Sequence, residues 1–265
     1  MAQTYLDDIV AHHRARAASD AREWRERIET IHYAGPSMIE ALSATKSPYV
    51  KVIAEVKRRS PAKGWIDRHL DARSLATAYQ RAGASAISVL TDEAHFSGSL
   101  RDFNDVRSAV TLPLLRKDFT VSANDVLDAA AMGASTVLLI VAALSDAELE
   151  LFLRIADQVN ISALVEVHDL EEARRALDVG ATLIGVNQRD LTTFEVDTER
   201  AASVAAGLSG HALTVAESGL STSDDVTRAA SAGFDAVLIG ETFVRSSDPE
   251  ATVRSFSSVS LASRA

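Results

Sequence analysis

The sequence predicts a (β/α)8 barrel, an α/β fold in which eight parallel strands, each followed by a helix, close into a cylinder. Eight apolar, strand-like runs recur along the chain, and stretches of helical pattern separate them. Continuous apolar runs that alternate with helices are typical of a parallel sheet buried on both faces. The length of 265 residues is also close to the ~250 residues typical of a one-domain barrel of this kind.

The strands and helices of this TIM barrel follow one another in regular order. The predicted strands are 52–57, 86–90, 112–117, 136–141, 163–167, 183–187, 213–218 and 236–240. Several of the intervening helical patterns begin with good N-cap residues, among them Ser122 and Ser145. The helices predicted after the strands are 71–82, 100–109, 122–132, 145–158, 169–179, 197–206, 221–232 and 248–257.

An internal repeat supports the barrel. Gly83, Gly133, Gly180 and Gly233 each stand where a predicted helix stops and a short turn leads into the next strand. A helix end often needs a left-handed residue at this position, and glycine adopts that conformation most readily. The four copies recur about every two strand–helix units, as expected for an even-numbered barrel built from half-repeats.

The residues before the first strand predict an extension of the barrel. Apolar residues recur at helical spacing within 3–18, and two further helices are expected at 20–32 and 36–44. A segment of about fifty residues can hardly form an independent core. We therefore expect one domain, with residues 1–48 packed as a helical extension on a barrel core of residues 49–257.

Composition excludes several classes of function. The formal net charge of -10 argues against non-specific binding to nucleic acid or to an anionic membrane. The absence of cysteine excludes disulfides, thiolate metal sites and cysteine nucleophiles. No apolar stretch approaches a membrane span, and the N-terminus lacks the pattern of a signal peptide. We expect a cytoplasmic protein whose partner is a small molecule.

Ionisable residues at strand ends indicate an enzyme with one charged pocket. Glu55 and Lys57 point to the same face of the first strand, either as functional groups or as a buried structural ion pair. Lys117 ends the third strand, where desolvation and neighbouring cations would lower its pKa toward the range useful for acid–base chemistry. Lys117 could also form a Schiff base, or simply cap the strand and reach water.

Two further strands contribute candidates to the same pocket. A lone Glu166 in an apolar strand needs a partner or a raised pKa, and its natural partners across a barrel mouth are the two lysines. His168 lies just past that strand and is expected to be a loop or cap residue. Asn187 ends the sixth strand and can both donate and accept hydrogen bonds. Arg189 is either a carboxylate clamp or the partner of Asp190.

The turns after the last two strands predict a phosphate site. Glu217, Ser218 and Gly219 end the seventh strand, and Gly240 and Glu241 follow the eighth. These turns are the usual phosphate cradle of this fold, since glycines let the backbone approach and helix N-termini favour anions. The alternative is two tight turns without a ligand. No metal-ligating pattern occurs: the seven histidines are scattered, and adjacent His12 and His13 cannot share one helix face.

With these residues in place, the chain closely resembles the indole-3-glycerol-phosphate synthases of tryptophan biosynthesis. The resemblance extends from about residue 50 to 245, and its motifs are specific because they occur together in one order. The motifs are IAEVKRRSP (53–61), SVLTDEAHFSGS (88–99), PLLRKDF (113–119), VLLIVAAL (137–144), LVEVHD (164–169), IGVNQRDL (184–191), VAESG (215–219) and VLIGE (237–241).

The resemblance implies a substrate and catalytic roles. The substrate would be 1-(2-carboxyphenylamino)-1-deoxyribulose 5-phosphate, converted without a cofactor. Lys117 would protonate the ketone oxygen during ring closure, and Glu166 would be the base in the final dehydration. Lys57 would steer the carboxylate and phosphate and would be a candidate second acid. Supporting roles, in orienting the lysines, the substrate hydroxyls and the reacting groups, would fall to Glu55, Glu217 and Asn187.

The resemblance also implies binding residues. The phosphate and other parts of the substrate would contact Ser60, Ser218, Gly219, Gly240 and Glu241, the last two through backbone NH groups. Phe96, with Trp65 as a further candidate, would line the pocket for the aromatic ring. Three features depart from the expected pattern: Ala62, Gln188 and the absence of an arginine from 127–131. They concern loop and phosphate details rather than the proposed acid and base.

Rival functions stay open at this stage. Phosphoribosylanthranilate isomerase is a related barrel, but that family uses a cysteine, which this chain lacks. An aldolase would use Lys117 as a Schiff base, and a phosphate-binding barrel without catalysis would bind ligand but not turn it over. A monomer, a weak homo-oligomer and contact with other tryptophan-pathway enzymes are all compatible with the sequence.

Overall fold

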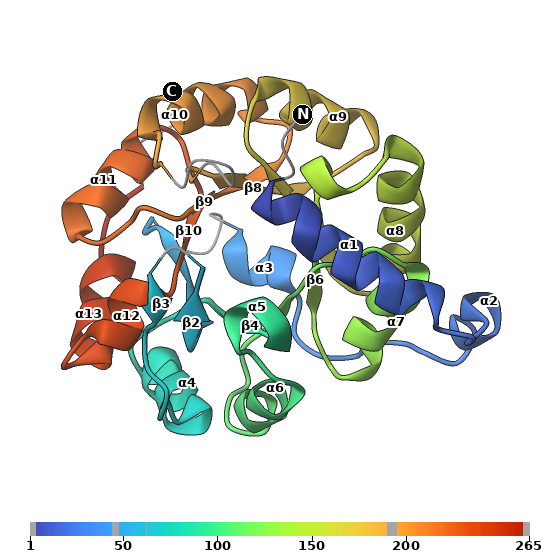
Figure 1. Cartoon of the computed structure of the whole chain (residues 1–265). Coiled ribbons are helices and arrows are strands. Elements are labelled where there is room, and N and C mark those ends of the chain that lie inside the picture. The colour runs from blue at the N-terminus through green and yellow to red at the C-terminus, as the bar shows by residue number, and fades with distance from the viewer. Residues whose placement is uncertain (1–3, 44–47, 62, 190–194, 262–265) are drawn as a thin grey trace.

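A computed structural model describes residues 4–43, 48–61, 63–189 and 195–261. Eight parallel strands close into a barrel with the neighbour order β1-β4-β5-β6-β7-β8-β9-β10, and β10 pairs with β1. Helices surround the strands as an outer ring (Figure 1). The (β/α)8 fold predicted from the sequence is confirmed. The barrel strands are β1 (Lys51–Val56), β4 (Ala86–Leu90), β5 (Leu114–Lys117), β6 (Thr136–Ile140), β7 (Ser162–Val167), β8 (Leu183–Asn187), β9 (Leu213–Glu217) and β10 (Ala236–Ile239).

The outer helices begin where short polar side chains cap them. Ser122 accepts a hydrogen bond from the backbone NH of Asp125, and Ser145 forms a capping box with Glu148. Gly83 and Gly133 follow two helix ends with φ near +90°, as the glycine repeat predicts. The outer helices are α4 (Ala72–Arg81), α6 (Leu100–Arg107), α7 (Ala123–Ala131), α8 (Asp146–Gln158), α9 (Leu170–Asp178), α10 (Thr198–Leu208), α11 (Ser223–Ser231) and α13 (Pro249–Ser257).

Several short elements follow the strands at their carboxyl ends. The sequence predicts a turn at Gly240 but none of the other short elements. They are the β2–β3 hairpin (Arg59–Ser60 and Gly64–Trp65), α5 (Glu93–Phe96), the 3-10 turn η2 (Val141–Ala143) and α12 (Glu241–Arg245). None of the helices in the described ranges has the length and apolar character needed to cross a membrane.

Within the described residues before the barrel, 4–43 and 48–50, three helices occur: α1 (Tyr5–Ala18), α2 (Trp24–Arg27) and α3 (Met38–Leu42). Met38 and Leu42 are buried in the cluster that fills the barrel interior, together with residues near the start of the strands such as Ala86 and Ala236. Helix α3 therefore plugs the amino-terminal end of the barrel. Helix α1 crosses on the side of α7 and α8 (Figure 1), where Arg14 forms an ion pair with Glu148.

The helix predicted at 20–32 is wrong in its extent, since α2 covers only Trp24–Arg27. The preceding turn is fixed by Asp20, whose carboxylate accepts hydrogen bonds from the backbone NH and the guanidinium of Arg22. Arg22 and Arg27 both form ion pairs with Asp128 of α7. These contacts hold the segment against the barrel in a shape that a continuous helix would not allow.

Candidate functional site

A cavity of about 680 Å³ opens at the carboxyl ends of the strands. This volume lies in the range typical of sites for small molecules. The structure brings all the predicted site residues except Trp65 to its lining, although their roles remain predictions. They are Glu55, Lys57, Ser60, Phe96, Lys117, Glu166, Asn187, Arg189, Glu217, Ser218, Gly219, Gly240 and Glu241.

One lysine and three glutamates form a charged layer in this cavity. Glu55, Lys117, Glu166 and Glu217 come from β1, β5, β7 and β9, which are every second strand around the barrel. Side chains from alternate strands share a layer in this fold. Nζ of Lys117 donates a hydrogen bond of 3.1 Å to Oε2 of Glu166 and lies 3.6 Å from Oε2 of Glu217.

The pKa of Lys117 is raised above its ordinary value, contrary to the lowering expected from the sequence. Burial alone would lower this pKa, but the negative charges of Glu166, Glu217 and Glu55 outweigh burial. The sequence-based expectation invoked neighbouring cations, whereas the nearest charges are carboxylates. Lys117 is therefore an ammonium ion that can donate a proton, and a neutral amine able to form a Schiff base is disfavoured.

The two carboxylates beside Lys117 have different protonation. Burial raises the pKa of Glu217 to about 8 against the opposing charge of Lys117, and the charges of Glu166 and Glu55 add to the rise. Burial also acts to raise the pKa of Glu166, but Lys117, His168 and the hydrogen bond from Asn187 lower it overall. Near neutral pH, Glu166 is thus the ionised carboxylate, which is the form a base requires.

Two glycines make room for the carboxylates of this layer. A Cβ atom on Gly185 of β8 would collide with Oε1 of Glu217, and one on Gly240 would collide with Oε1 of Glu55. Glu55 in turn forms an ion pair with Lys57, as expected for residues on one face of a strand. The barrel wall is therefore shaped around the charged groups.

Asn187 fixes the position of Glu166. Its Nδ2 donates a hydrogen bond of 3.1 Å to Oε1 of Glu166, and its Oδ1 accepts one from the backbone NH of Arg189 at 3.1 Å. His168 does not line the cavity. Its Nδ1 lies 3.0 Å from Glu172, and its Nε2 lies 3.9 Å from Oε1 of Glu166. His168 is thus a supporting residue, in line with the sequence interpretation.

Arg189 lines the cavity, but its alternative partner Asp190 lies outside the described residues. Ala62, one of the departures from the family pattern, also lies outside them.

The turns predicted to hold phosphate meet at one end of the cavity. Ser218 and Gly219 both have left-handed backbones, with φ of 67° and 71°, and the chain turns sharply there. Helix α12 begins after Gly240 without a side-chain cap. Thr242 at its start donates a hydrogen bond to the carbonyl of Leu220 and so joins the two turns.

Cations also gather at this end. Glu241 lies 3.2 Å from Nζ of Lys63 and 3.0 Å from Nε of Arg245. Burial acts to raise the pKa of Glu241, but these two cations hold it below its ordinary value. Lys63 is placed by a turn in which its backbone NH donates to Oγ of Ser60. Lys63 and Arg245 line the cavity and were not among the residues predicted for the site.

Another part of the cavity lining is apolar and aromatic. Phe96 of α5 lies 6.1 Å from Phe119, measured between ring centroids. Trp65 does not line the cavity: its ring is exposed and packs under Arg68 instead. Tyr5, Leu6 and Ile9 of α1 complete this wall. Their helical spacing was visible in the sequence, but it indicated packing on the barrel rather than a place in the cavity.

The chain matches the family model for indole-3-glycerol phosphate synthase over residues 6–256. The chain belongs to this family. It is 46% identical to the indole-3-glycerol phosphate synthase of Mycobacterium ulcerans (strain Agy99) over 251 residues, which cover 94% of this chain and 92% of the relative. It is 46% identical to that of Parafrankia sp. (strain EAN1pec) over 249 residues, covering 92% and 91%.

The matches to both synthases extend over nearly the whole length of each chain. Similarity to more distant solved structures supports the fold alone. A thiamine phosphate pyrophosphorylase from Pyrococcus furiosus matches with a TM-score of 0.59 at 20% identity, covering 78% of this chain and 93% of that chain. A 3-hexulose-6-phosphate synthase from Salmonella typhimurium matches with a TM-score of 0.61 at 15% identity, covering 79% and 97%.

Proposed function

We propose that this member of the family is a carboxy-lyase that converts 1-(2-carboxyphenylamino)-1-deoxy-D-ribulose 5-phosphate to indole-3-glycerol phosphate, carbon dioxide and water. The observation that carries this proposal is the Lys117–Glu166 pair, a buried acid and base at 3.1 Å inside the cavity. Ring closure and dehydration need these two groups, and the family to which the chain belongs is named for the product.

The first step forms a carbon–carbon bond. The ring carbon that carries the carboxylate attacks the ketone carbon of the ribulose chain, and the ammonium group of Lys117 donates a proton to the ketone oxygen. The raised pKa of Lys117 keeps its amine protonated until the substrate reacts. The aromatic ring becomes a cation that has lost its aromaticity. The enzyme has to hold ring and carbonyl in contact, and positioning of this kind lowers the barrier substantially.

The second step needs no external electron acceptor. The cationic ring accepts the electron pair of the bond to the carboxylate, so that carbon dioxide leaves. The hydroxyl group formed in the first step then departs as water, with Lys57 as the candidate second acid. Loss of carbon dioxide has by then restored the aromatic benzene ring, and after water has left Glu166 removes the proton from the new five-membered ring whose loss completes the indole. Asn187 orients Glu166, while Glu55 and Glu217 orient the lysines and the substrate hydroxyls.

The two ends of the cavity suit the two ends of this substrate. We place the phosphate against the turns after β9 and β10, where Ser218, Gly219 and Gly240 lie, and Ser60 and Glu241 beside them. Lys63 and Arg245 would supply positive charge there. We place the aromatic ring against Phe96 and the apolar residues of α1. Arg189 is our candidate for the carboxylate.

An assay with the purified full-length chain tests this proposal. Formation of indole-3-glycerol phosphate is followed by its fluorescence after addition of the carboxyphenylamino substrate, and release of carbon dioxide is measured in parallel. We expect equal amounts of both products. Binding of the substrate without turnover would refute the proposal and favour a barrel that only binds phosphate. Trapping of substrate on Lys117 by borohydride would favour an aldolase.

The remaining assignments complete the proposal. The partner is a small phosphorylated molecule, and neither nucleic acid nor a membrane is required. A cytoplasmic location follows from biosynthetic use of a small metabolite. The isomerase alternative is disfavoured by the family match and by the absence of cysteine from the sequence.

A further inference from the structure

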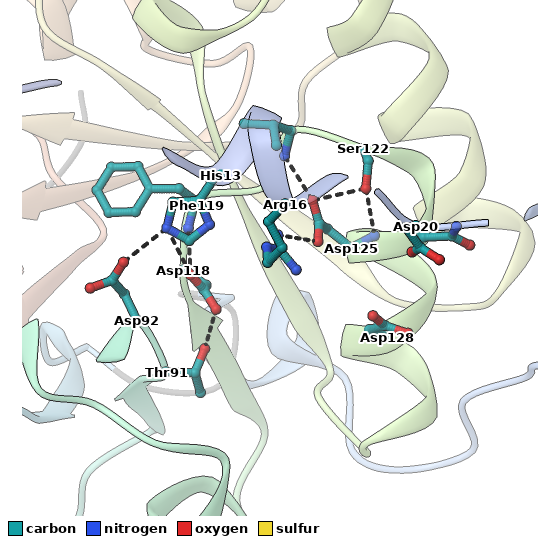
Figure 2. A network of polar contacts seen from close by, with 12 residues as sticks. His13, Arg16, Asp20, Thr91, Asp92, Asp118, Phe119, Ser122, Asp125 and Asp128 are labelled. Atoms are coloured by element: carbon teal, nitrogen blue, oxygen red, sulfur yellow. Dashed lines mark hydrogen bonds and ion pairs between the residues drawn. The ribbon is translucent and has the colours of Figure 1, made fainter. Parts of the chain in front are cut away.

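Two histidines and an aspartate meet where helix α1 contacts the segment after β4. His13 lies on α1, Asp92 is the N-cap of α5, and His95 lies within α5. Nε2 of His13 is 2.8 Å from Oδ2 of Asp92, and Nδ1 of His95 is 3.0 Å from the same oxygen. Figure 2 shows His13 and Asp92 facing one another. These ligand atoms all lie within 4.8 Å of one another, and in the described ranges no other cluster of His, Cys, Asp or Glu does so.

We propose that His13, Asp92 and His95 bind a transition-metal ion of the Zn²⁺ class. Two imidazoles and a carboxylate are the nitrogen and oxygen donors that Zn²⁺ and its neighbours in the series accept. His13 and Asp92 are only 6% and 3% exposed, so the donors are already desolvated. Both imidazoles direct a nitrogen at one carboxylate oxygen, and an ion between the three groups would contact all of them.

The distances require little rearrangement. Ligand atoms about 2.1 Å from a tetrahedral Zn²⁺ lie ~3.4 Å from one another. The two nitrogen–oxygen distances of 2.8 and 3.0 Å would have to open by about half an ångström to admit the ion. A shift of this size is within the reach of side-chain torsions alone.

Asp118 is the candidate for a fourth donor. Its Oδ1 lies 3.9 Å from Nε2 of His13, on the side that Figure 2 shows beneath the imidazole. Its other oxygen, Oδ2, accepts hydrogen bonds from Thr91 at 2.6 Å and Arg116 at 2.9 Å. These two contacts fix the carboxylate so that Oδ1 faces His13. Asp118 lies outside the group whose ligand atoms meet within 4.8 Å of one another, so its carboxylate would have to move closer to complete a tetrahedral set of two imidazoles and two carboxylates.

The donors are held in place without the ion. Oδ1 of Asp92 accepts hydrogen bonds from the backbone NH groups of His95 at 2.6 Å and Phe96 at 3.0 Å, which leaves Oδ2 turned toward the imidazoles. Helix α1 is anchored separately, since Arg16 lies 2.6 Å from Asp125 of α7, as Figure 2 shows. A metal site is tighter when its ligands are oriented by other contacts in this way.

The ion would fasten one wall of the cavity. It would bridge α1, which contributes Tyr5 and Ile9 to that wall, and α5, which contributes Phe96. The proposed role is structural, and no step of the reaction passes through the ion. The sequence-based expectation of no metal pattern considered neighbouring histidines, whereas the fold joins His13 with residues about eighty positions later.

Spectroscopy on the full-length chain tests this proposal. The purified protein is stripped with EDTA, freed of chelator and titrated with Co²⁺, whose visible absorption reports tetrahedral coordination. We expect one equivalent to bind with tetrahedral bands, and Zn²⁺ to displace it. Zn²⁺ at about a hundred times its Kd should raise the thermal unfolding midpoint by ~5 °C.

Variants distinguish metal binding at this site from non-specific metal binding elsewhere on the protein. His13→Asn and His95→Asn should each weaken Co²⁺ binding at least about tenfold, since each removes a ligand. His211→Asn is the matched control, because His211 is exposed and distant in the chain from the cluster. Circular dichroism checks that each variant is folded, and either His variant alone suffices for the test. Equal Co²⁺ affinity in all four proteins, or no tetrahedral bands in the unmodified chain, would overturn the proposal.

Discussion

The substitution Gly185→Ala tests whether the barrel wall positions the charged layer. Gly185 is not among the described residues with a positive φ angle. Alanine can therefore adopt the backbone conformation that Gly185 has in its strand. The new methyl carbon would lie well inside van der Waals contact with Oε1 of Glu217, while Leu164 blocks another side. The carboxylate must therefore move by on the order of 1 Å, and misplacement by this amount can cost about a hundredfold in rate.

The assay for Gly185→Ala is indole fluorescence at saturating and at low substrate. We expect kcat to fall about a hundredfold, because Glu217 lies 3.6 Å from the acid Lys117 and its displacement disturbs that group. Gly207→Ala on the outer helix α10 is the control and should keep normal activity. A folded Gly185→Ala variant with an unchanged kcat would refute the reasoning that links the glycine to the catalytic geometry.

Three further predictions concern individual side chains. Glu217 has a pKa of about 8 when folded and near 4.5 when unfolded, so the folded chain holds an extra proton between these values and loses stability as the pH rises through them. Glu217→Gln should remove this pH-dependent loss of stability, which a series of melting temperatures from pH 5 to about 8.5 measures. The prediction is contradicted if the melting temperature of the variant falls with pH as steeply as that of the parent protein. Glu166→Gln should slow turnover by roughly 10²–10⁴ and let an intermediate accumulate before dehydration, which single-turnover mass spectrometry would detect. A variant that turned over at the parent rate without accumulating this intermediate would exclude Glu166 as the base. Arg245→Ala should raise KM about tenfold with little change in kcat, as expected for loss of a charge-assisted phosphate contact; Arg254→Ala on α13 is the control, and equal KM values in both would remove Arg245 from the phosphate site.

The barrel could be predicted from the sequence because each strand is recognisable from its own residues. Each is a continuous apolar run, and capping residues such as Ser122 mark where the next helix begins. Boundaries were less accurate where local chemistry intervened. The strand predicted at 112–117 begins only at Leu114, because Pro113 cannot donate a backbone hydrogen bond. Helix α5 was missed because one side chain, the cap Asp92, creates its single turn.

The charged layer was predictable for a simple geometric reason. Polar residues at the ends of parallel strands converge at one mouth, so Lys117 and Glu166 had to lie near one another. The distances between these charged groups were not predictable, and the distances determine the direction in which each pKa shifts. The pKa of Lys117 was expected to be lowered by cations, but three carboxylates raise it. The contribution of α1 was also missed, since the spacing of Tyr5 and Ile9 shows an apolar face without showing what it covers.

The most direct test of the account is the kcat of Lys117→Ala. The account predicts a loss of roughly 10²–10⁴, with the variant still folded by circular dichroism, because the proton donor for ring closure is gone. Lys63→Ala removes another lysine of the same cavity that is half exposed, and it should retain most of its kcat. Near-normal turnover by folded Lys117→Ala would contradict the central claim that the buried ammonium group is the acid.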